Sequence, residues 1–319
     1  MKHNPITVFG GTGNPNLTTA ICKHLSIGAG VAKIWSFPDG EKCVRLESDV
    51  RGHDCFVVQP TCAPVDENLV ELLIFLDCLR RASAARVTAV VPYFGYARQD
   101  RKDAGRVPIT AKLVANLMTA AGANRVLTID LHAKQLQGFF DIPVDHLTAE
   151  PVMIQYLRKK QIPELTVVSP DAGNMKTASR YATALGAELA VIHKRRLSGN
   201  EVAFEEIIGN VQGRNIVMCD DMISTGGTIA GAAHLIKSRG AKHIYVGATH
   251  GLFCGEAVEK LQQSPIDEVI VTDTIPQDEK AGWLKNITVL SVAELLGEAI
   301  RRIHDNESLS RMFEEMNPS

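Results

Sequence analysis

The stretch NIVMCDDMISTGGT, residues 215–228, joins an apolar run to two adjacent carboxylates and then to a series of small hydroxyl and glycine residues. The apolar part predicts a buried strand and the following residues predict a helix, so the polar residues fall at the carboxyl end of a strand. Ligands of open parallel sheets bind at such ends. The carboxylates of Asp220 and Asp221 suit hydroxyl groups or a metal ion. The glycines and the helix start suit a phosphate, because backbone N–H groups can approach it closely.

A simpler interpretation is that Asp221 and Ser224 only start and cap the helix. One such residue is enough for a cap, so a doublet followed by five small residues favours a ligand site. The residues of this predicted site are Asp220, Asp221, Ser224, Thr225, Gly226, Gly227 and Thr228.

Short β-rich runs alternate with helix-length segments along almost the whole chain. The helical segments, such as 66–82, place apolar residues at three- and four-residue spacing. This alternation predicts α/β domains with parallel sheets that helices cover on both faces. The expected strands are residues 6–9, 55–59, 86–92, 125–130, 165–169, 215–220, 243–250 and 268–273.

An internal repeat indicates two similar domains. GANRVLTIDLH (122–132) and GAKHIYVGATH (240–250) share Gly-Ala, two polar residues, a strand and a terminal His, and each follows a helical segment. We expect an N-terminal domain of residues 1–148 and a C-terminal domain of residues 149–319, whose tail could pack back on the first domain.

The composition excludes several classes of protein. The chain has 319 residues, 45% hydrophobic and 22% charged, with a formal net charge of -2, which gives no indication of nucleic-acid or anionic-membrane binding. No apolar run approaches the roughly 18 residues of a membrane span, and the start of the chain does not resemble a secretory signal. The seven cysteines form no CxxC pair. We therefore expect a cytoplasmic protein without structural zinc.

The glycine-rich segment VFGGTGNPN (8–16) invites a dinucleotide-binding interpretation, which fails. Counted from Gly11, the second glycine position is Gly13, but the third is Asn16. The segment is more typical of a turn that leads into a helix.

Two basic segments follow predicted strands. YARQDRKDAGRVP (96–108) is either a solvated surface loop or a mobile arm over a polyphosphate, for which Arg is well suited. IHKRRLSGNEV (192–202) ends a predicted strand with a basic triplet, which is either a solvated loop or a means of neutralising charge in phosphoryl transfer.

Other polar residues after strands suggest a cation and a base. His132 and Asp171 each follow a strand; singly they are typical structural residues, but together they could hold a divalent cation with phosphate oxygens. WSFPDGEKC (35–43) reads first as a hairpin turn. Alternatively, Phe37 could stack on a purine that Asp39 and Glu41 hydrogen-bond.

Taken together, these motifs resemble one family. DDMISTGGT is similar to the ribose 5-phosphate loop of type I phosphoribosyltransferases. With FPDGE, YARQDRKD, LHAKQLQGFFDIPVDHL, SPDAG, HKRR and THGLF, the chain resembles the ribose-phosphate pyrophosphokinases from about residue 5 to its end. The resemblance implies two type I phosphoribosyltransferase-like domains, each a mainly parallel sheet flanked by helices.

The resemblance also implies an activity. It is the transfer of the β,γ-diphosphoryl group of ATP to O1 of ribose 5-phosphate, with Mg²⁺, giving 5-phosphoribosyl 1-diphosphate (PRPP) and AMP for nucleotide, His and Trp biosynthesis. By similarity, Phe37, Asp39 and Glu41 would meet the adenine from a neighbouring subunit, and Arg98 and Gln99 would contact ATP. His132 and Asp171 would hold Mg²⁺, and Lys194 and Arg196 would stabilise the transition state. Asp220 and Asp221 would engage the ribose hydroxyls, and residues 224–228 the 5-phosphate.

Similar family members are hexamers that inorganic phosphate activates and ADP inhibits. The residues that match their regulatory site are Ser48, Arg106, Ser308 and Ser310. The resemblance implies no nucleic-acid or membrane partner.

Three other functions compete with this interpretation. A salvage phosphoribosyltransferase would share the loop at 220–228, but is normally a single domain and leaves FPDGE and YARQDRKD unexplained. A catalytically silent regulatory subunit would carry insertions or substitutions around the catalytic loops, whereas His132, Asp171, Lys194 and Arg196 are intact. A general nucleotide-binding module would leave the sugar-phosphate loop idle.

Overall fold

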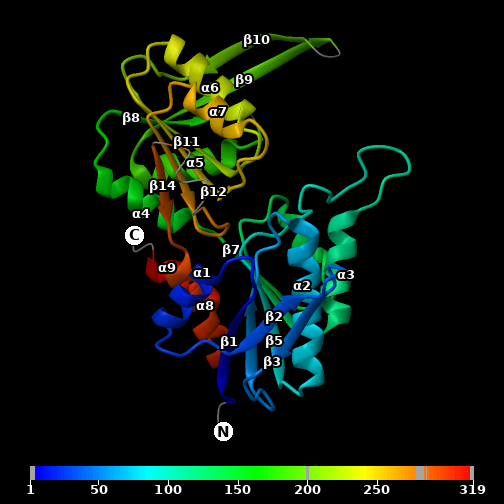
Figure 1. Ribbon diagram of the computed structural model, residues 1–319. Coiled ribbons are helices and arrows are strands. Elements are labelled where there is room, and N and C mark those ends of the chain that lie inside the picture. Colours follow the sequence, from blue (N-terminus) through cyan, green and yellow to red (C-terminus); the bar gives the residue numbers. More distant parts are fainter. Residues whose placement is uncertain (1–3, 172, 199–200, 278–283, 285, 317–319) are drawn as a thin grey trace. The chain divides into compact units, whose positions relative to one another are not determined.

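The computed structural model describes residues 4–171, 173–198, 201–277, 284 and 286–316, and the side chains of 194–198, 201–205 and 313–316 are not described (Figure 1). The chain forms two compact units. The first runs to Ala149 and includes Thr274–Pro276 and the segment from Ser291 onward; the second comprises Glu150–Asp273 and Gln277–Leu290. The break after Ala149 lies one residue from the expected boundary, and the last segment of the chain groups with the first unit.

The first unit is built on a five-stranded parallel sheet in the order β1-β4-β5-β6-β7. All five residues of β4 are buried, as expected for an inner strand of a sheet covered on both faces. Its strands are β1 (Ile6–Gly10), β4 (Asp54–Val58), β5 (Arg86–Val91), β6 (Arg125–Ile129) and β7 (Val144–Leu147). Its helices are α1 (Pro15–His24), α2 (Val65–Arg81), α3 (Thr110–Ala121), the 3-10 helix η1 (Lys134–Phe139), α8 (Ala293–Asp305) and α9 (Leu309–Met316).

An antiparallel hairpin, β2 (Ala32–Ser36) and β3 (Lys42–Leu46), packs on α2 in the first unit (Figure 1). Ile34 and Val44 pair across the hairpin and join the core that α2 covers. Because side chains alternate along a strand, the neighbouring residues point to the opposite face. The hairpin that was the simpler interpretation of residues 35–43 is therefore present.

A charged cluster ties α8 to the sheet of the first unit. Arg86 makes a paired hydrogen bond with the buried carboxylate of Asp54, and its Nη2 also donates to the Ile303 carbonyl at 2.9 Å. His304 Nδ1 lies 2.9 Å from Asp54 Oδ2. These contacts join residues more than 200 positions apart and explain why the end of the chain groups with its beginning.

The second unit contains a seven-stranded sheet in the order β10-β9-β8-β11-β12-β13-β14. All neighbouring strands are parallel except β9 and β10, which form an antiparallel ribbon. The strands are β8 (Leu165–Ser169), β9 (Glu188–Ser198), β10 (Glu201–Ile208), β11 (Asn215–Ile223), β12 (Ile244–Gly251), β13 (Glu268–Thr272) and β14 (Ile287–Leu290). The helices are α4 (Glu150–Lys160), α5 (Met175–Leu185), α6 (Gly227–Ser238) and α7 (Ala257–Gln262).

The alternation along β11 shows how helices cover both faces of this sheet. Ile216 and Met218 enter the core shared with α6 and α7, whereas Val217 and Cys219 enter the core shared with α4 and α5. The fold class predicted from the sequence, mainly parallel sheets flanked by helices, is confirmed.

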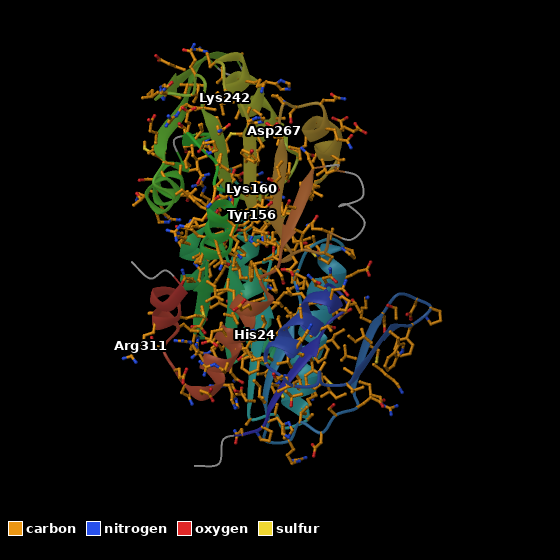
Figure 2. All side chains as sticks on the ribbon, turned by 90° about the vertical axis from the view of Figure 1, so that its left-hand side faces the viewer. His24, Tyr156, Lys160, Lys242, Asp267 and Arg311 are labelled. Carbon is orange, nitrogen blue, oxygen red and sulfur yellow. The ribbon has the colours of Figure 1, made fainter. Side chains whose placement is uncertain are left out.

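At one end of the second sheet, a polar cluster fastens α4 (Figure 2). Glu268 accepts a hydrogen bond from the Tyr156 hydroxyl at 2.5 Å and pairs with Lys160 at 2.6 Å. The Lys160 ammonium also lies 5.3 and 5.4 Å from the ring centroids of Tyr156 and Tyr245. This cluster lies at the start of β13, so it supports the fold at the amino ends of the parallel strands.

The sequence predicted that a strand ends with the basic triplet 194–196, and in the structure this strand is longer. β9 continues to Ser198 because it pairs with β10, with Lys194 opposite Glu205 and Arg196 opposite Val202.

None of the helices that the structure describes combines the length and the hydropathy that a membrane span requires.

Candidate functional site

The carboxyl ends of β8 and β11 meet at a change of direction in the second sheet. From β8 the chain continues to β9 on one side, whereas β11 lies on the other side and leads on to β12, β13 and β14. Ligands of open α/β sheets bind at such switch points, because the following helices cover opposite faces and leave a crevice. Asp171 follows β8, and Asp220 and Asp221 lie in the last part of β11.

Residues 224–228 connect β11 to α6. Gly226 is the N-cap of the helix, with a φ of 72°, and as a glycine it has no side chain of its own to cap the first turn. Thr225, Gly227 and Thr228 are exposed, and Ser224 is half-buried. A left-handed residue followed by the first turn of a helix exposes N–H groups whose partial charge favours an anion. The phosphate site that the sequence predicts is thus compatible with the local backbone.

The loop after β12 holds this connection in place. The N–H groups of Leu252 and Phe253 donate to the Ile223 carbonyl at 3.0 and 3.1 Å, and the Cys254 N–H donates to the Ser224 carbonyl at 2.8 Å. A Cβ at Gly226 would lie 3.4 Å from the Ala257 carbonyl oxygen. The loop at 252–257 therefore forms a support for residues 223–226, a role that sequence reasoning did not assign to THGLF.

The carboxylates at the switch point influence one another. Burial, followed by the charge and hydrogen bond of Asp221 and the charge of Asp171, raises the pKa of Asp220 to about 7. The Asp221 N–H donates to Asp220 Oδ1 at 2.9 Å. The carboxyl oxygens of such a pair can accept hydrogen bonds from the hydroxyl groups of a ligand.

Asn174 connects the two strand ends and was missed in the sequence. Its Nδ2 donates to the Cys219 carbonyl at 2.5 Å, and its N–H donates to Asp171 Oδ1 at 2.9 Å. Ser169 Oγ also donates to the Asp171 carbonyl at 2.6 Å. The side chain and N–H of Asn174 therefore fix Asp171 relative to the end of β11.

The two residues expected to stabilise the transition state are only partly visible. The backbones of Lys194 and Arg196 lie in β9, next to β8 in the sheet, and their side chains lie outside the described part of the structure.

In the first unit, the hairpin presents the residues expected at the base. Phe37 N–H donates to the Glu41 carbonyl and Gly40 N–H to the Phe37 carbonyl, both at 2.8 Å, and Glu41 N–H donates to Asp39 Oδ1 at 3.2 Å. Gly40 has a φ of 94°, which only glycine adopts readily. This tight turn places the Phe37 ring and both carboxylates at an exposed tip.

Arg98 and Gln99 lie in the loop after β5 and are exposed. Gln99 is held at both ends, because its N–H donates to the Tyr96 carbonyl at 2.9 Å and its Oε1 accepts a hydrogen bond from Thr110 Oγ1 at 2.5 Å. The further basic residues of this segment, Arg101, Lys102 and Arg106, are also exposed.

His132 follows β6 in the first unit and is exposed, like Asp171 in the second unit. Asp130, two residues before His132, has a structural role, since its Oδ2 accepts the Ala149 N–H at 2.9 Å. Within the described residues, no three His, Cys, Asp or Glu side chains gather into a metal site.

The four residues expected at a regulatory site all belong to the first unit. Ser48 Oγ accepts the Val31 N–H at 2.9 Å, and the Ser308 carbonyl accepts a hydrogen bond from Arg302 Nη1 at 3.0 Å. Arg106 and Ser310 are exposed.

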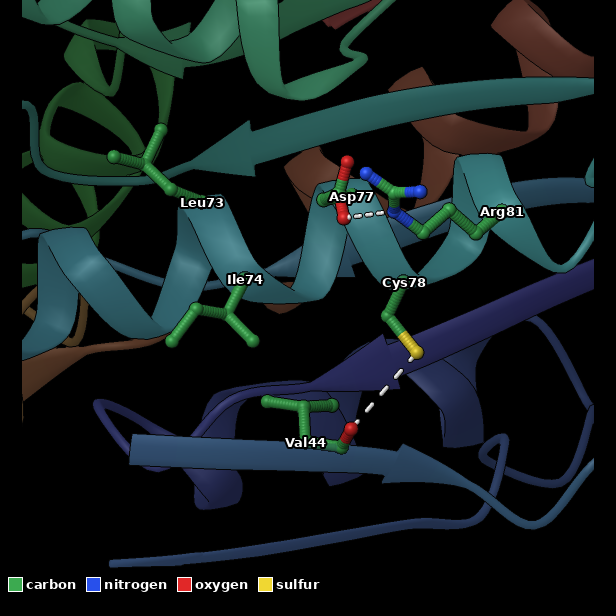
Figure 3. A pocket seen from close by; sticks show the side chains of 6 residues that line it. All are labelled: Val44, Leu73, Ile74, Asp77, Cys78 and Arg81. Atoms are coloured by element: carbon green, nitrogen blue, oxygen red, sulfur yellow. Dashed lines mark hydrogen bonds and ion pairs between the residues drawn. The ribbon is translucent and has the colours of Figure 1, made fainter. Parts of the chain in front are cut away.

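A groove of about 450 Å³ lies between α2 and β3 (Figure 3). It is open and mainly apolar, and none of the predicted site residues lines it. Its polar contacts are internal: Arg81 Nε donates to Asp77 Oδ2 at 2.6 Å, and Cys78 Sγ lies 3.9 Å from the Val44 carbonyl. Its lining residues are Val44, Leu73, Ile74, Asp77, Cys78 and Arg81.

The parallel sheets, the acidic pair at a switch point and the glycine-capped helix after it define the phosphoribosyltransferase-like class of α/β proteins. Comparisons with known proteins specify the family. Residues 6–122 match the N-terminal domain of ribose phosphate pyrophosphokinase, and residues 200–314 match the phosphoribosyl synthetase-associated domain.

Relatives match over the full length. Ribose-phosphate pyrophosphokinase of Rhodopirellula baltica is 54% identical over 97% of this chain and 99% of its own length, and that of Chromobacterium violaceum is 50% identical over 98% and 96%. A crystal structure of phosphoribosylpyrophosphate synthetase from Mycobacterium smegmatis covers 95% of this chain and 100% of its own, with 41% identity and a TM-score of 0.89. The chain belongs to the ribose-phosphate pyrophosphokinase family and is an enzyme. The resemblance predicted from the motifs is confirmed.

Proposed function

We propose that this enzyme transfers the β,γ-diphosphoryl group of ATP to O1 of ribose 5-phosphate, giving PRPP and AMP. In this reaction a bond forms between O1 and the β-phosphorus, the bond from the β-phosphorus to the bridging oxygen of the α-phosphate breaks, and O1 loses its proton. The product would feed nucleotide, His and Trp biosynthesis.

One observation carries the proposal: the Asp220–Asp221 pair and the glycine-capped start of α6 follow one another at the β8/β11 switch point. A sugar phosphate has hydroxyl groups for the carboxylates and a phosphate for the helix start. The N–H contacts from 252–254 to the Ile223 and Ser224 carbonyls would keep the phosphate loop in shape. Positioning of this kind is the main contribution a protein makes to phosphoryl transfer.

Charge neutralisation is the second requirement. In the proposal, Arg98 and Gln99 contact ATP, and Lys194 and Arg196 stabilise the charge that develops on the transferred group. Phe37, Asp39 and Glu41 bind the adenine of ATP. In a hexamer these three residues would meet the adenine from a neighbouring subunit. The proposed domains are residues 1–148, which carry the ATP motifs, and residues 149–319, which carry the ribose 5-phosphate loop.

His132 and Asp171 are the proposed protein ligands of Mg²⁺. Their exposure at strand ends fits this ion, which takes only one or two protein ligands and completes its shell with water and phosphate oxygens. Bound there, Mg²⁺ would neutralise charge on the triphosphate. Asn174 would orient Asp171 through the hydrogen bond to its Oδ1. Phosphate activation and ADP inhibition through Ser48, Arg106, Ser308 and Ser310 belong to the same proposal.

Phosphorus NMR of the purified protein with ATP, Mg²⁺ and ribose 5-phosphate tests the reaction. We expect AMP to appear in step with a new diphosphate ester. ADP with a simple phosphate ester would mean an ordinary γ-kinase and would refute the proposal. No turnover, with inorganic phosphate present, would favour a silent subunit or a salvage enzyme.

The assignment of Lys194 has its own test. Lys194→Ala should lower kcat while substrate binding is largely kept, because the charge it meets develops only in the transition state. Arg195→Ala, the neighbouring position on the strand, is the matched control. Weakened binding with unchanged kcat would remove Lys194 from this role.

A further inference from the structure

Trp35 and Phe37 form an exposed aromatic pair on the β2–β3 hairpin. Their ring centroids lie 6.1 Å apart, and the ring planes meet at 70°, an edge-to-face arrangement. Trp35 remains 39% exposed and Phe37 46% exposed. Two large aromatic side chains are therefore in contact with each other and with solvent.

The packing of the hairpin on α2 does not require this pair. Ile34 and Val44 make that contact from the opposite face, and Lys42 reaches Glu67 and Glu71 of α2 from the same side as Val44. Trp35 pairs across the hairpin with Cys43, on the outward face. The position of Trp35 is thus better explained by its neighbour Phe37 than by the core.

The hairpin fixes the backbone of Phe37 but not the direction of its ring. The hydrogen bonds of Phe37 N–H and of its carbonyl define the turn, whereas rotation about its side-chain bonds is limited by contact with other groups. Among the described ring contacts of Phe37, Trp35 provides the edge-to-face one. A ring held in this way loses less freedom when a flat ligand stacks on it.

We propose that Trp35 is a positioning and specificity residue of the nucleotide-base site: it holds the Phe37 ring for stacking and so favours a purine base over a pyrimidine. The proposal rests on the proposed function, in which Phe37 meets adenine. A purine offers two fused rings to the aromatic pair, and the carboxylates of Asp39 and Glu41 at the same tip can accept hydrogen bonds from an exocyclic amino group.

Tryptophan emission tests this directly. ATP is added to the holoenzyme without ribose 5-phosphate, and the emission of Trp35→Phe is subtracted from that of the unchanged protein, which removes the contribution of Trp283. We expect ATP to change the Trp35 emission at concentrations near its KM. CTP at the same concentration and ribose 5-phosphate alone should leave it unchanged. An emission that ATP does not alter would overturn the proposal.

Kinetics give a second, independent readout. Trp35→Ala should raise the KM for ATP about three- to tenfold, the worth of one edge-to-face pair and one ordered side chain, and reduce the preference for ATP over CTP. The KM for ribose 5-phosphate and kcat should stay within about twofold. Trp35→Phe, which keeps an aromatic ring, should recover most of the loss. Lys33→Ala is the control, since Lys33 lies two residues away on the same face and pairs with Glu47.

Equal KM values for ATP in Trp35→Ala and Lys33→Ala would reject the role of Trp35. The outcomes also separate the two proposals. If PRPP forms but ATP does not change the Trp35 emission, the further inference fails and the proposed function stands. If ATP changes the emission but no PRPP forms, the base site stands and the proposed reaction fails.

Discussion

The replacement Asp220→Asn should change how the stability of the second unit depends on pH. In the structure, burial, with smaller contributions from Asp221 and Asp171, raises the pKa of Asp220 from an ordinary value of 3.8 to about 7. The folded unit therefore binds a proton in a pH range where the unfolded chain does not. Asparagine has nearly the same shape and never carries the charge.

The sign follows from the two pKa values. A group whose pKa is higher in the folded state contributes stability that is present below the unfolded pKa and is lost as the pH rises through the folded pKa. For Asp220 this window runs from about pH 4 to about pH 7. A shift of about three units corresponds to roughly 4 kcal/mol in total, of which roughly 3 kcal/mol falls between pH 5 and pH 8.

Hydrogen exchange of peptides from β11 and β12, measured without ligands at pH 5 and pH 8, reports on this unit. Comparison of variants at each pH cancels the pH dependence of the chemical exchange rate. From pH 5 to pH 8, we expect the free energy of unfolding of the unchanged protein to fall by roughly 3 kcal/mol more than that of Asp220→Asn. Asp39→Asn, an exposed carboxylate of the hairpin, should behave like the unchanged protein. Parallel losses in Asp220→Asn and the unchanged protein would refute the reasoning.

Three further predictions concern the phosphate loop, the hairpin and the attachment of α8. Gly226→Ala should lower the free energy of unfolding by about 1–2 kcal/mol, because Gly226 has a φ of 72°, and should raise the KM for ribose 5-phosphate. The control is Gly231→Ala within α6, which has open space for a Cβ and should have neither effect. Thermal melting and steady-state kinetics check both variants. Lys42→Met should lower the free energy of unfolding by about 2–3 kcal/mol, because it removes the cation paired with the fully buried Glu71 carboxylate. Adding Glu71→Gln should restore more than half of this loss, as measured by denaturant unfolding in a double-mutant cycle. Arg86→Met should expose α8 to limited proteolysis, whereas Arg125→Met, equally exposed and paired with Asp145, should not.

Local patterns predicted the parallel strands well. Runs such as 55–58 and 216–219 are apolar on both faces, which is typical of inner parallel strands. The β9–β10 ribbon was not predicted, since residues 194–198 and 201–206 are rich in charged side chains and become strand only by pairing with each other. Propensity contains no information about such a partner.

The return of the chain end to the first unit could be raised only as a possibility from the sequence. It depends on the contacts of Asp54 and Arg86 with residues 303–306, which no local pattern encodes. Gly297 adds to this, because a Cβ there would come within 2.6 Å of the His24 ring. A glycine inside a helical pattern would otherwise only lower confidence in the helix.

The candidate site shows the same division between local and long-range information. A strand followed by carboxylates and glycines marked residues 220–228, because that motif is continuous in sequence. Asn174 was missed, because its hydrogen bond to the Cys219 carbonyl exists only when β8 and β11 are neighbours. Two strands, β9 and β10, separate β8 from β11 in the chain.

The order of the strands also explains why so many supports converge there. β8, β11 and β12 are consecutive in the sheet, so their carboxyl ends bring Asp171, the acidic pair and the loop at 252–257 together. The loops after β8 and β12 hold the backbone of 219–224 from its two sides, through Asn174 and through the N–H groups of 252–254. This bracing fixes the backbone that carries the two adjacent acidic residues, which is what the proposed sugar-phosphate site requires.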